Sequence, residues 1–389
     1  MSNRYLALGL LLAAVTPLVF SFRGPRSEAP PAPAPKNPRV QVALLLDVSN
    51  SMDGLIDQAK AQLWSTVQLL GRAQCPEGAP KIEIALYEYG RTSNNPAAGY
   101  VKRITPFTSN LDSLSLLLFA LKTNGGEEYC GQAISTSVKE LDWDTAAGTY
   151  KVAFIAGNES FRQGSVQYTQ ACLEARQRGI ILNTIYCGDR MSGIRDFWDL
   201  GAECGTGNFT SINSNSKLED IPTPYDSTLI TLNSRFNGTH IAYGRVGASG
   251  FMSMETADVA NVAHSRKTAA ARIAVKGKKS LYKNVQWDLI DAATDDKQGD
   301  SIYVAKMNRS ELPDSLKKKS NAELLRLVRA KNAEREAVRQ AIEKTSAERE
   351  QWLAAERRKR AQQTNEATLE TEMEKILKEQ AGRFGYRIQ

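Results

Sequence analysis

An apolar run that ends in one acid and two hydroxyls constrains this chain more than any other stretch. It covers residues 40–46 and is followed by Asp47, Ser49 and Ser51. A short run rich in Val and Leu, bounded by small polar residues, predicts a fully buried parallel strand. Open α/β sheets bind ligands beyond the carboxyl ends of their strands. The sequence therefore predicts a binding site where this strand ends.

The residue types at this strand end favour a metal ion. A carboxylate and two hydroxyls are hard oxygen ligands, and alternate positions of one loop face the same way. They suit Mg²⁺, which keeps several waters and needs only one or two carboxylates. The alternative is that Ser49 and Ser51 only cap the helix that follows.

The segment Asp47-Val48-Ser49-Asn50-Ser51 resembles the first loop of the metal-ion-dependent adhesion site in von Willebrand factor A-type domains. The second loop of that family usually reads Gly-Gly-Thr. Here residues 125–128 read Gly-Gly-Glu-Glu, so Glu127 or Glu128 offers an oxygen where the threonine is expected.

The third loop of the family commonly ends a buried strand in an aspartate. Here the matching position is Gly157, and Asn158 or Glu159 is the available substitute. The resemblance covers roughly residues 38–215 and implies a protein-binding face with a degenerate metal site. The implied cation is Mg²⁺, with Mn²⁺ or Ca²⁺ as alternatives. The implied metal ligands are Asp47, Ser49, Ser51, Glu127 and Glu128.

Periodicity independently predicts an α/β fold. Short apolar runs alternate with helical patterns over residues 39–215, and residues 81–107 read as a hairpin. We therefore expect a doubly wound, mostly parallel sheet with one antiparallel edge strand. Residues 216–310 are predicted to form a helical extension packed on this domain.

The charged C-terminal region, residues 311–389, is expected to form long helices. Residues 320–323 read as a capping box, and a thin apolar stripe follows. This stripe predicts either a helical hairpin or a coiled coil with another chain, which would give a homo-oligomer. A mostly solvated charged helix is the alternative.

The N-terminal region indicates export. Residues 1–22 carry an apolar run typical of a signal peptide or an uncleaved signal anchor, and residues 23–38 form a Pro-rich linker. We expect a periplasmic or cell-envelope location, with a membrane tether through residues 5–22 if the segment stays attached.

The cysteine count predicts disulfide bonds with one thiol left over, given five cysteines in an exported body. Cys130, Cys172 and Cys187 are expected at the carboxyl edge of the sheet, and Cys75 and Cys204 at the opposite edge. Pairing across these two groups is therefore disfavoured. The alternative is five free thiols.

Several functions are disfavoured by composition and motif. The net charge of +7 comes from bases interleaved with acids, which argues against nucleic-acid binding. The chain has two histidines and no phosphate-loop motif. Cys187 ends a buried strand and is expected to be packed or disulfide-bonded, so no enzyme is predicted. Four further acids are interpreted as a solvated face: Asp288, Asp291, Asp295 and Asp296.

The sequence favours two functions over a third, an enzyme that would use Cys187 or the metal for hydrolysis. The first is an exported module that binds a protein partner through the loops at the carboxyl ends of the strands, completing the coordination of a cation. The second is a cell-envelope scaffold that self-associates through the C-terminal helices and carries a metal-free A-type domain.

Overall fold

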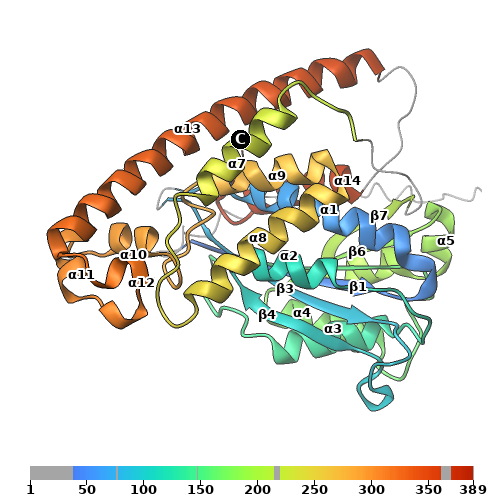
Figure 1. Ribbon diagram of the computed structural model, residues 1–389. Coiled ribbons are helices and arrows are strands. Elements are labelled where there is room, and N and C mark those ends of the chain that lie inside the picture. Colours follow the sequence, from blue (N-terminus) through green and yellow to red (C-terminus); the bar gives the residue numbers. More distant parts are fainter. Residues whose placement is uncertain (1–37, 76–77, 147, 214–219, 361–368, 389) are drawn as a thin grey trace, which may run out of the picture. The chain divides into compact units, whose positions relative to one another are not determined.

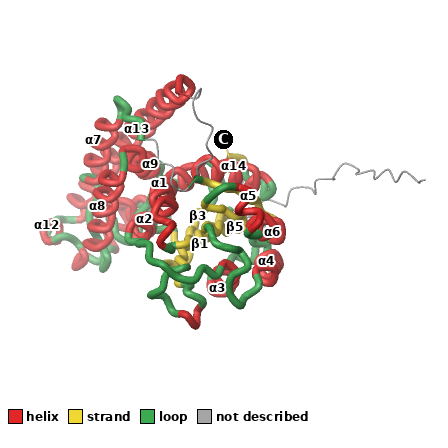
Figure 2. Tube along the Cα trace, turned by 90° about the vertical axis from the view of Figure 1, so that its right-hand side faces the viewer, coloured by secondary structure: helices red, strands yellow, loops and turns green. Residues whose placement is uncertain are grey.

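Six strands form one sheet with helices on both faces (Figure 1; Figure 2). The computed structural model describes residues 38–75, 78–146, 148–213, 220–360 and 369–388. The predicted signal segment and all but the last residue of the predicted linker lie outside these residues. The strands are β1 Arg39–Asp47, β3 Lys81–Tyr89, β4 Lys102–Thr108, β5 Tyr150–Gly157, β6 Ile181–Cys187 and β7 Thr206–Ile212.

The sheet order is β4-β3-β1-β5-β6-β7. All neighbours pair in parallel except β3 and β4, so β4 is an antiparallel edge strand. The predicted doubly wound, mostly parallel sheet is thereby confirmed. Because β1 lies at the centre, its carboxyl end is flanked by loops that follow both of its neighbours.

Helices cover the two faces of the sheet differently. One face packs under α3 Cys130–Glu140, α4 Tyr168–Gln177 and α6 Trp198–Cys204, with the short α5 Arg190–Arg195 beside β7. The other packs under α1 Asp53–Leu70, α2 Leu111–Phe119 and, from the far end of the chain, α14 Leu369–Gly382. In β1, Val42 and Leu46 face this second core, whereas Ala43 and Leu45 face the first. Both faces are buried, as a parallel strand requires.

The C-terminal helix α14 is held on the sheet by a buried amide. Gln380 is fully buried, and its Oε1 accepts a hydrogen bond from Tyr150 at 2.9 Å. Its Nε2 donates to Asn183 at 2.7 Å and to Asn208 at 2.8 Å. One side chain thus joins α14 to three strands, since these partners belong to β5, β6 and β7.

The short β8 Arg387–Ile388 pairs with β2 Ala73–Gln74. Beside this pair, the hydroxyl of Tyr386 hydrogen-bonds both the amide and the carbonyl of Arg39, each at 3.1 Å. The two ends of the described chain therefore meet at one edge of the sheet, next to the first residue of β1.

The middle of the chain forms a helical region against α1 and α2. Its main helices are α7 Asp226–Asn237, α8 Gly247–His264 and α9 Arg266–Gly277, and α8 packs on α2 while α9 packs on α1. Arg272 of α9 is buried between Asp112 at 2.7 Å and Asp258 at 2.6 Å, and its guanidinium lies 4.8 Å from the Trp64 ring centroid. This ion pair ties three helices together because Asp112 belongs to α2 and Asp258 to α8.

The 40-residue helix α13 Asn321–Arg360 begins at the predicted capping box, where Ser320 and Glu323 bond reciprocally. Its apolar stripe packs within the chain: Leu324 and Val328 meet α10 Leu289–Asp295 and α11 Asp300–Lys306, and Val338 and Ile342 meet α7 and α9. The short α12 Asp314–Lys317 precedes it. Self-association through α13 stays a prediction. These four residues already pack against other helices of the same chain.

The interpretation of Asp288 and Asp291 as solvated is wrong. Their exposed fractions are 0% and 2%, whereas Asp295 is exposed. Arg335 of α13, also fully buried, donates to Asp288 at 2.6 Å and to Asp291 at 2.7 Å. The acids lie inside the protein because a cation more than forty residues along the chain neutralises them.

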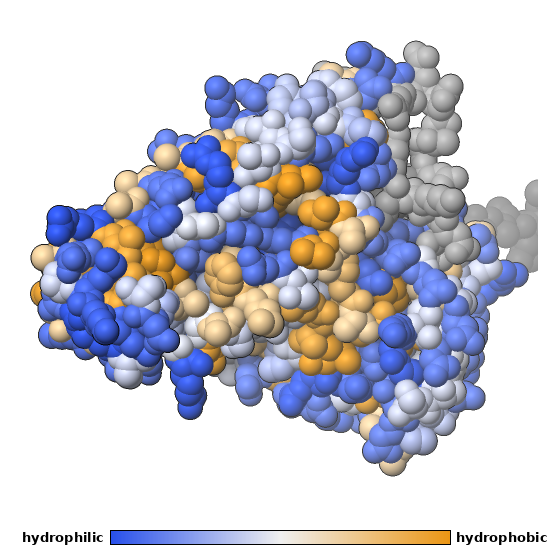
Figure 3. Space-filling model, in the orientation of Figure 1, coloured by the Kyte–Doolittle hydropathy of each residue, from blue (hydrophilic) through white to orange (hydrophobic). Residues whose placement is uncertain are grey.

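Apolar side chains are exposed on the face that carries α8 (Figure 3). Those of α8 itself are Met252, Val259 and Val262. Nothing among the described residues shows what would cover this surface, so it carries no inference about a partner. Within the described residues, no helix has the length and apolar character needed to span a bilayer.

We expect Arg335→Ala to destabilise the protein by about 3–5 kcal/mol, because it leaves two carboxylates buried without their cation. Arg329→Ala is the matched control, since Arg329 pairs with Asp300 on the surface of the same helix. Urea unfolding of both variants measures the effect. Equal midpoints for the two variants would contradict the importance of the buried pair.

Candidate functional site

The first predicted loop forms at the carboxyl end of β1. Asp47 is fully buried, and its Oδ1 accepts a hydrogen bond from the Ser49 amide at 2.7 Å. The hydroxyls of Ser49 and Ser51 lie 3.3 Å apart. Ser49 makes no side-chain capping hydrogen bond to the 3-10 turn Asn50–Met52. The helix-capping alternative is therefore wrong for Ser49, whose hydroxyl instead interacts with the carboxyls of Asp47 and Glu128.

The second loop brings Glu128 beside Asp47. Glu128 is 7% exposed, whereas Glu127 is exposed to solvent. A Cβ on Gly90 would lie 2.8 Å from Oδ1 of Asp47 and 2.9 Å from Cγ of Glu128, so the two side chains meet over this glycine. Gly126 is equally constrained, since its Cβ would lie 2.4 Å from the Gly90 carbonyl. The paired glycines of the sequence therefore allow the second loop to pack closely on the first.

At the third position, Tyr89 explains the absence of an acid. Its hydroxyl donates to the Ala156 carbonyl at 2.9 Å and would lie 2.5 Å from a Cβ on Gly157. No side chain fits at Gly157 unless Tyr89 moves. The next residue, Asn158, reaches the site instead, because its Nδ2 donates to the Ser51 hydroxyl at 3.1 Å. The sequence named Asn158 as a substitute but gave no signal for Tyr89.

Three buried oxygens of this cluster have no hydrogen-bond partner among the described residues. They come from three different loops and are Asp47 Oδ2, Glu128 Oε2 and Asn158 Oδ1. Buried polar atoms are nearly always paired, so three unpartnered oxygens from neighbouring loops are the kind of donor set that a bound ligand would satisfy. Carboxylate, amide and hydroxyl oxygens are the ligand set of Mg²⁺, Mn²⁺ and Ca²⁺, so the residues present fit a divalent cation.

Burial and mutual repulsion make the two carboxyls weak acids in the absence of a cation. Burial is the main cause that raises the pKa of Asp47 to about 7, and the charge of the nearby Glu159 adds to it. Burial, followed by the charges of Asp47 and Glu159, raises the pKa of Glu128 to about 8. A divalent cation would reverse both effects because it favours the ionised carboxylates.

A second group with metal-ligand atoms lies away from this loop. His240, Asp288 and Asp291 place one ligand atom each within 4.8 Å of the others. The guanidinium of Arg335 already bonds both carboxylates, however, and stands where a cation would. Burial and the charge of Arg335 hold the pKa of His240 well below its usual range, and the imidazole stacks on Trp287. This group is better explained as a structural ion pair.

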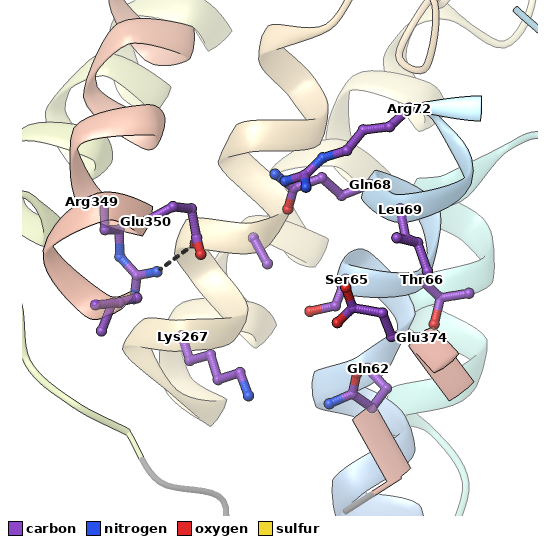
Figure 4. Close-up of a pocket in the computed structure, with 12 residues that line it drawn as sticks. Gln62, Ser65, Thr66, Gln68, Leu69, Arg72, Lys267, Arg349, Glu350 and Glu374 are labelled. Carbon is purple, nitrogen blue, oxygen red and sulfur yellow. Dashed lines mark hydrogen bonds and ion pairs between the residues drawn. The ribbon is translucent and has the colours of Figure 1, made fainter. Parts of the chain in front are cut away.

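A hollow of about 240 Å³ lies between α1, α9, α13 and α14 (Figure 4). Lys267, Arg72 and Glu374 line it, and its other basic residue, Arg349, is held by Asp226 at 2.8 Å and by Glu350. Its lining mixes both signs of charge without a convergent set of unpaired groups. The Asp47 loop is not part of its lining and is the better candidate site.

The cysteines offer no activated nucleophile at this edge. Burial raises the pKa of the Cys187 thiol and that of Cys130, so neither is a reactive thiolate at neutral pH. The structure contains no disulfide bond among the five cysteines, so the predicted disulfides stay a prediction.

No protein-family profile matches the chain, and no curated protein sequence matches it. Solved structures resemble part of it. One is an aerotolerance-related membrane protein from Bacteroides fragilis, with 17% identity over 45% of this chain and 93% of that chain and a TM-score of 0.32. Another is the SpRpn10 VWA domain, with 12% identity over 46% of this chain and 91% of that one and a TM-score of 0.35.

A third is proximal thread matrix protein 1 from the mussel byssus with a zinc-occupied MIDAS motif. It has 13% identity over 45% of this chain and 42% of that chain, and a TM-score of 0.34. Similarities this low do not indicate a function. Numbered along the chain, the six sheet strands have the order 3-2-1-4-5-6 of doubly wound α/β sheets, which agrees with the fold that the A-type resemblance implies.

The raised pKa values predict how stability depends on pH. Asp47 has a folded pKa of about 7 against an ordinary value of 3.8. The stabilisation that protonated Asp47 adds to the free energy of unfolding is therefore fully present below pH 3.8 and is lost as the pH rises through about 7. In buffer that contains a chelator, we expect the free energy of unfolding of Asp47→Asn to fall less between pH 5 and pH 8 than that of the parent protein. Glu127→Gln, at the exposed neighbour of Glu128, should follow the parent, and an Asp47→Asn profile that also follows it would contradict the assignment.

Proposed function

We propose that this chain is a protein-interaction module that binds a divalent cation at its loop edge, the set of loops that carries Asp47, Glu128 and Asn158. Mg²⁺ is the first candidate, and Mn²⁺ or Ca²⁺ are the alternatives. Asp47, Glu128 and Asn158 would hold the ion together with the hydroxyls of Ser49 and Ser51. When bound, the cation supplies a Lewis-acidic position that accepts a carboxylate oxygen of the partner protein.

The convergence of three orphaned oxygens from three loops carries this proposal. Asp47 ends β1, Asn158 follows β5 and Glu128 lies just before α3, so each side chain is held by its own element before any ligand arrives. Glu128 supplies the second negative charge that the missing aspartate at Gly157 would have supplied. Ser51 is exposed while Asp47 is fully buried, so the site is closed behind and open toward solvent.

We further propose that the module binds without catalysis and acts in the cell envelope. Support for binding is that neither histidine lies in the site: His240 stacks on Trp287, and His264 packs against Phe119. Support for an envelope location is the export-like run in residues 1–22, which lies outside the described residues.

The scaffold function has weaker support. Its sequence basis was the apolar stripe of α13, whose residues pack against α7, α9, α10 and α11 of the same chain. A scaffold assembled through this stripe would have to detach α13 first.

We expect calorimetric titration of Mg²⁺ or Mn²⁺ into the full chain to give saturable binding that Asp47→Asn and Glu128→Gln each weaken at least about tenfold, since each removes a charged ligand. Affinity should rise from pH 6 to pH 8 because the cation displaces protons from both carboxyls. The full chain is required, because α14 covers one core of the sheet.

Glu127→Gln is the control, since it removes a charge next to Glu128 that faces solvent. If it weakens binding as much as Glu128→Gln, general electrostatics rather than coordination explains the affinity. If no cation binds up to millimolar concentration, the proposed function is wrong.

The oligomeric state separates the two functions. We expect light scattering of the full chain at tens of micromolar to give a monomer, because Leu324, Val328, Val338 and Ile342 of α13 are already buried within the chain. A dimer that Val328→Glu disperses while leaving the circular dichroism spectrum unchanged would favour the scaffold.

A further inference from the structure

Two cysteines face each other across the packed helices α4 and α6. The Cys172 thiol donates to the Gly201 carbonyl at 3.5 Å, and the Cys204 thiol donates to the Thr169 carbonyl at 3.7 Å. Each cysteine thus bonds the carbonyl three residues before the other cysteine. This reciprocal pattern places both sulfur atoms in the same narrow space between the helices.

The sequence had placed these two cysteines at opposite edges of the sheet, which is wrong. Cys172 lies in the first half of α4 and Cys204 ends α6, but the two helices cross so that these positions coincide. The two thiols lie close enough that Cys204 adds to burial in raising the pKa of Cys172. Neither residue belongs to the cation site.

We propose that Cys172 and Cys204 form a reversible disulfide bond that fastens α4 to α6 when the protein meets an oxidising environment. The proposal does not depend on the cation site. It assigns two of the five cysteines to one another and leaves Cys75, Cys130 and Cys187 as thiols.

The surroundings of the other three cysteines support this assignment. Cys130 contacts the Tyr89 hydroxyl at 3.8 Å, behind Asp47. Cys187 is buried at the end of β6, and Cys75 bonds the Gly78 carbonyl at 3.2 Å in a surface turn. These three thiols come from different parts of the fold, whereas Cys172 and Cys204 share one helix–helix contact.

The chemistry requires a disulfide-bearing oxidant, such as oxidised glutathione or a protein disulfide. The thiolate of Cys204, which is half-buried, attacks the oxidant and releases one thiolate. The thiolate of Cys172, which is fully buried, then attacks the Cys204 sulfur and releases the second. The protein loses two protons and two electrons, and the oxidant gains them as two thiols. Because burial raises the pKa of Cys172, closure should be faster at higher pH.

Oxidation would join two parts of the chain that flank β6. The closed loop runs from α4 through β6 and α5 to the residue that precedes Gly205 and β7. A cross-link over a loop of this length restricts the unfolded chain, and we expect it to raise the thermal unfolding midpoint by about 5 °C or more.

Peptide mapping of the full-length protein tests the proposal. The reduced protein is oxidised with oxidised glutathione, denatured, alkylated with iodoacetamide and digested with trypsin. Arg176 and Arg195 place the two cysteines in different tryptic peptides, and Arg178 and Arg190 separate Cys187 from both. We expect three alkylated cysteines and one disulfide-linked pair of peptides that contain Cys172 and Cys204. Treatment with dithiothreitol should restore five alkylated cysteines and lower the unfolding midpoint.

Two variants sharpen the result. Cys204→Ser should give no intramolecular link and no oxidant-dependent rise in the midpoint, whereas Cys75→Ser should retain both. Alkylation of all five cysteines after oxidation, or a link that involves Cys75, Cys130 or Cys187, would overturn the proposal. The map of the parent protein decides the question even if Cys204→Ser does not fold.

Discussion

A parallel sheet must be covered on both faces, and this requirement determines how the whole chain is arranged. Helices that follow the strands cover one face completely. The other face is completed by α14, which arrives from the far end of the sequence and inserts Met373, Ile376 and Leu377 into the same core as β1. The charged C-terminal region is therefore part of the folded body. Its long helix α13 packs along α7, α9, α10 and α11, and its buried Arg335 and Arg349 pair with acids from elsewhere in the chain.

The loop edge follows from the same arrangement. With β1 in the centre, loops from β1, β3 and β5 meet around the buried Asp47. Both Gly90 and Gly157 lie at this point, and a side chain at either position would crowd the Asp47 carboxylate. Two carboxyls buried side by side with orphaned oxygens are costly unless a cation or protons neutralise them. A protein that retains such a pair has its stability coupled to cation concentration and to pH at a single place.

The sequence predicts what is decided by nearby residues. Strand and helix order, the antiparallel edge and the Asp47–Ser51 loop all follow from local patterns, because a buried strand requires an apolar run and a loop ligand requires a particular side chain. The choice between Glu127 and Glu128 does not follow, since it depends on how the second loop folds over Gly90. The same holds for Asp288 and Asp291, whose burial depends on Arg335, and for the meeting of Cys172 with Cys204, which depends on a helix crossing.

The contact between Tyr386 and Arg39 holds the two ends of the described chain at the opposite end of β1 from the Asp47 loops. Both ends of the folded body lie at the first residue of β1, and Asp47 lies at the last, eight residues or about 26 Å along the strand. An affinity tag or a sensor surface joined beside residue 38 or residue 388 is therefore held at one pole. The loop edge then points outward at the other pole, where a large partner can reach it without meeting the support.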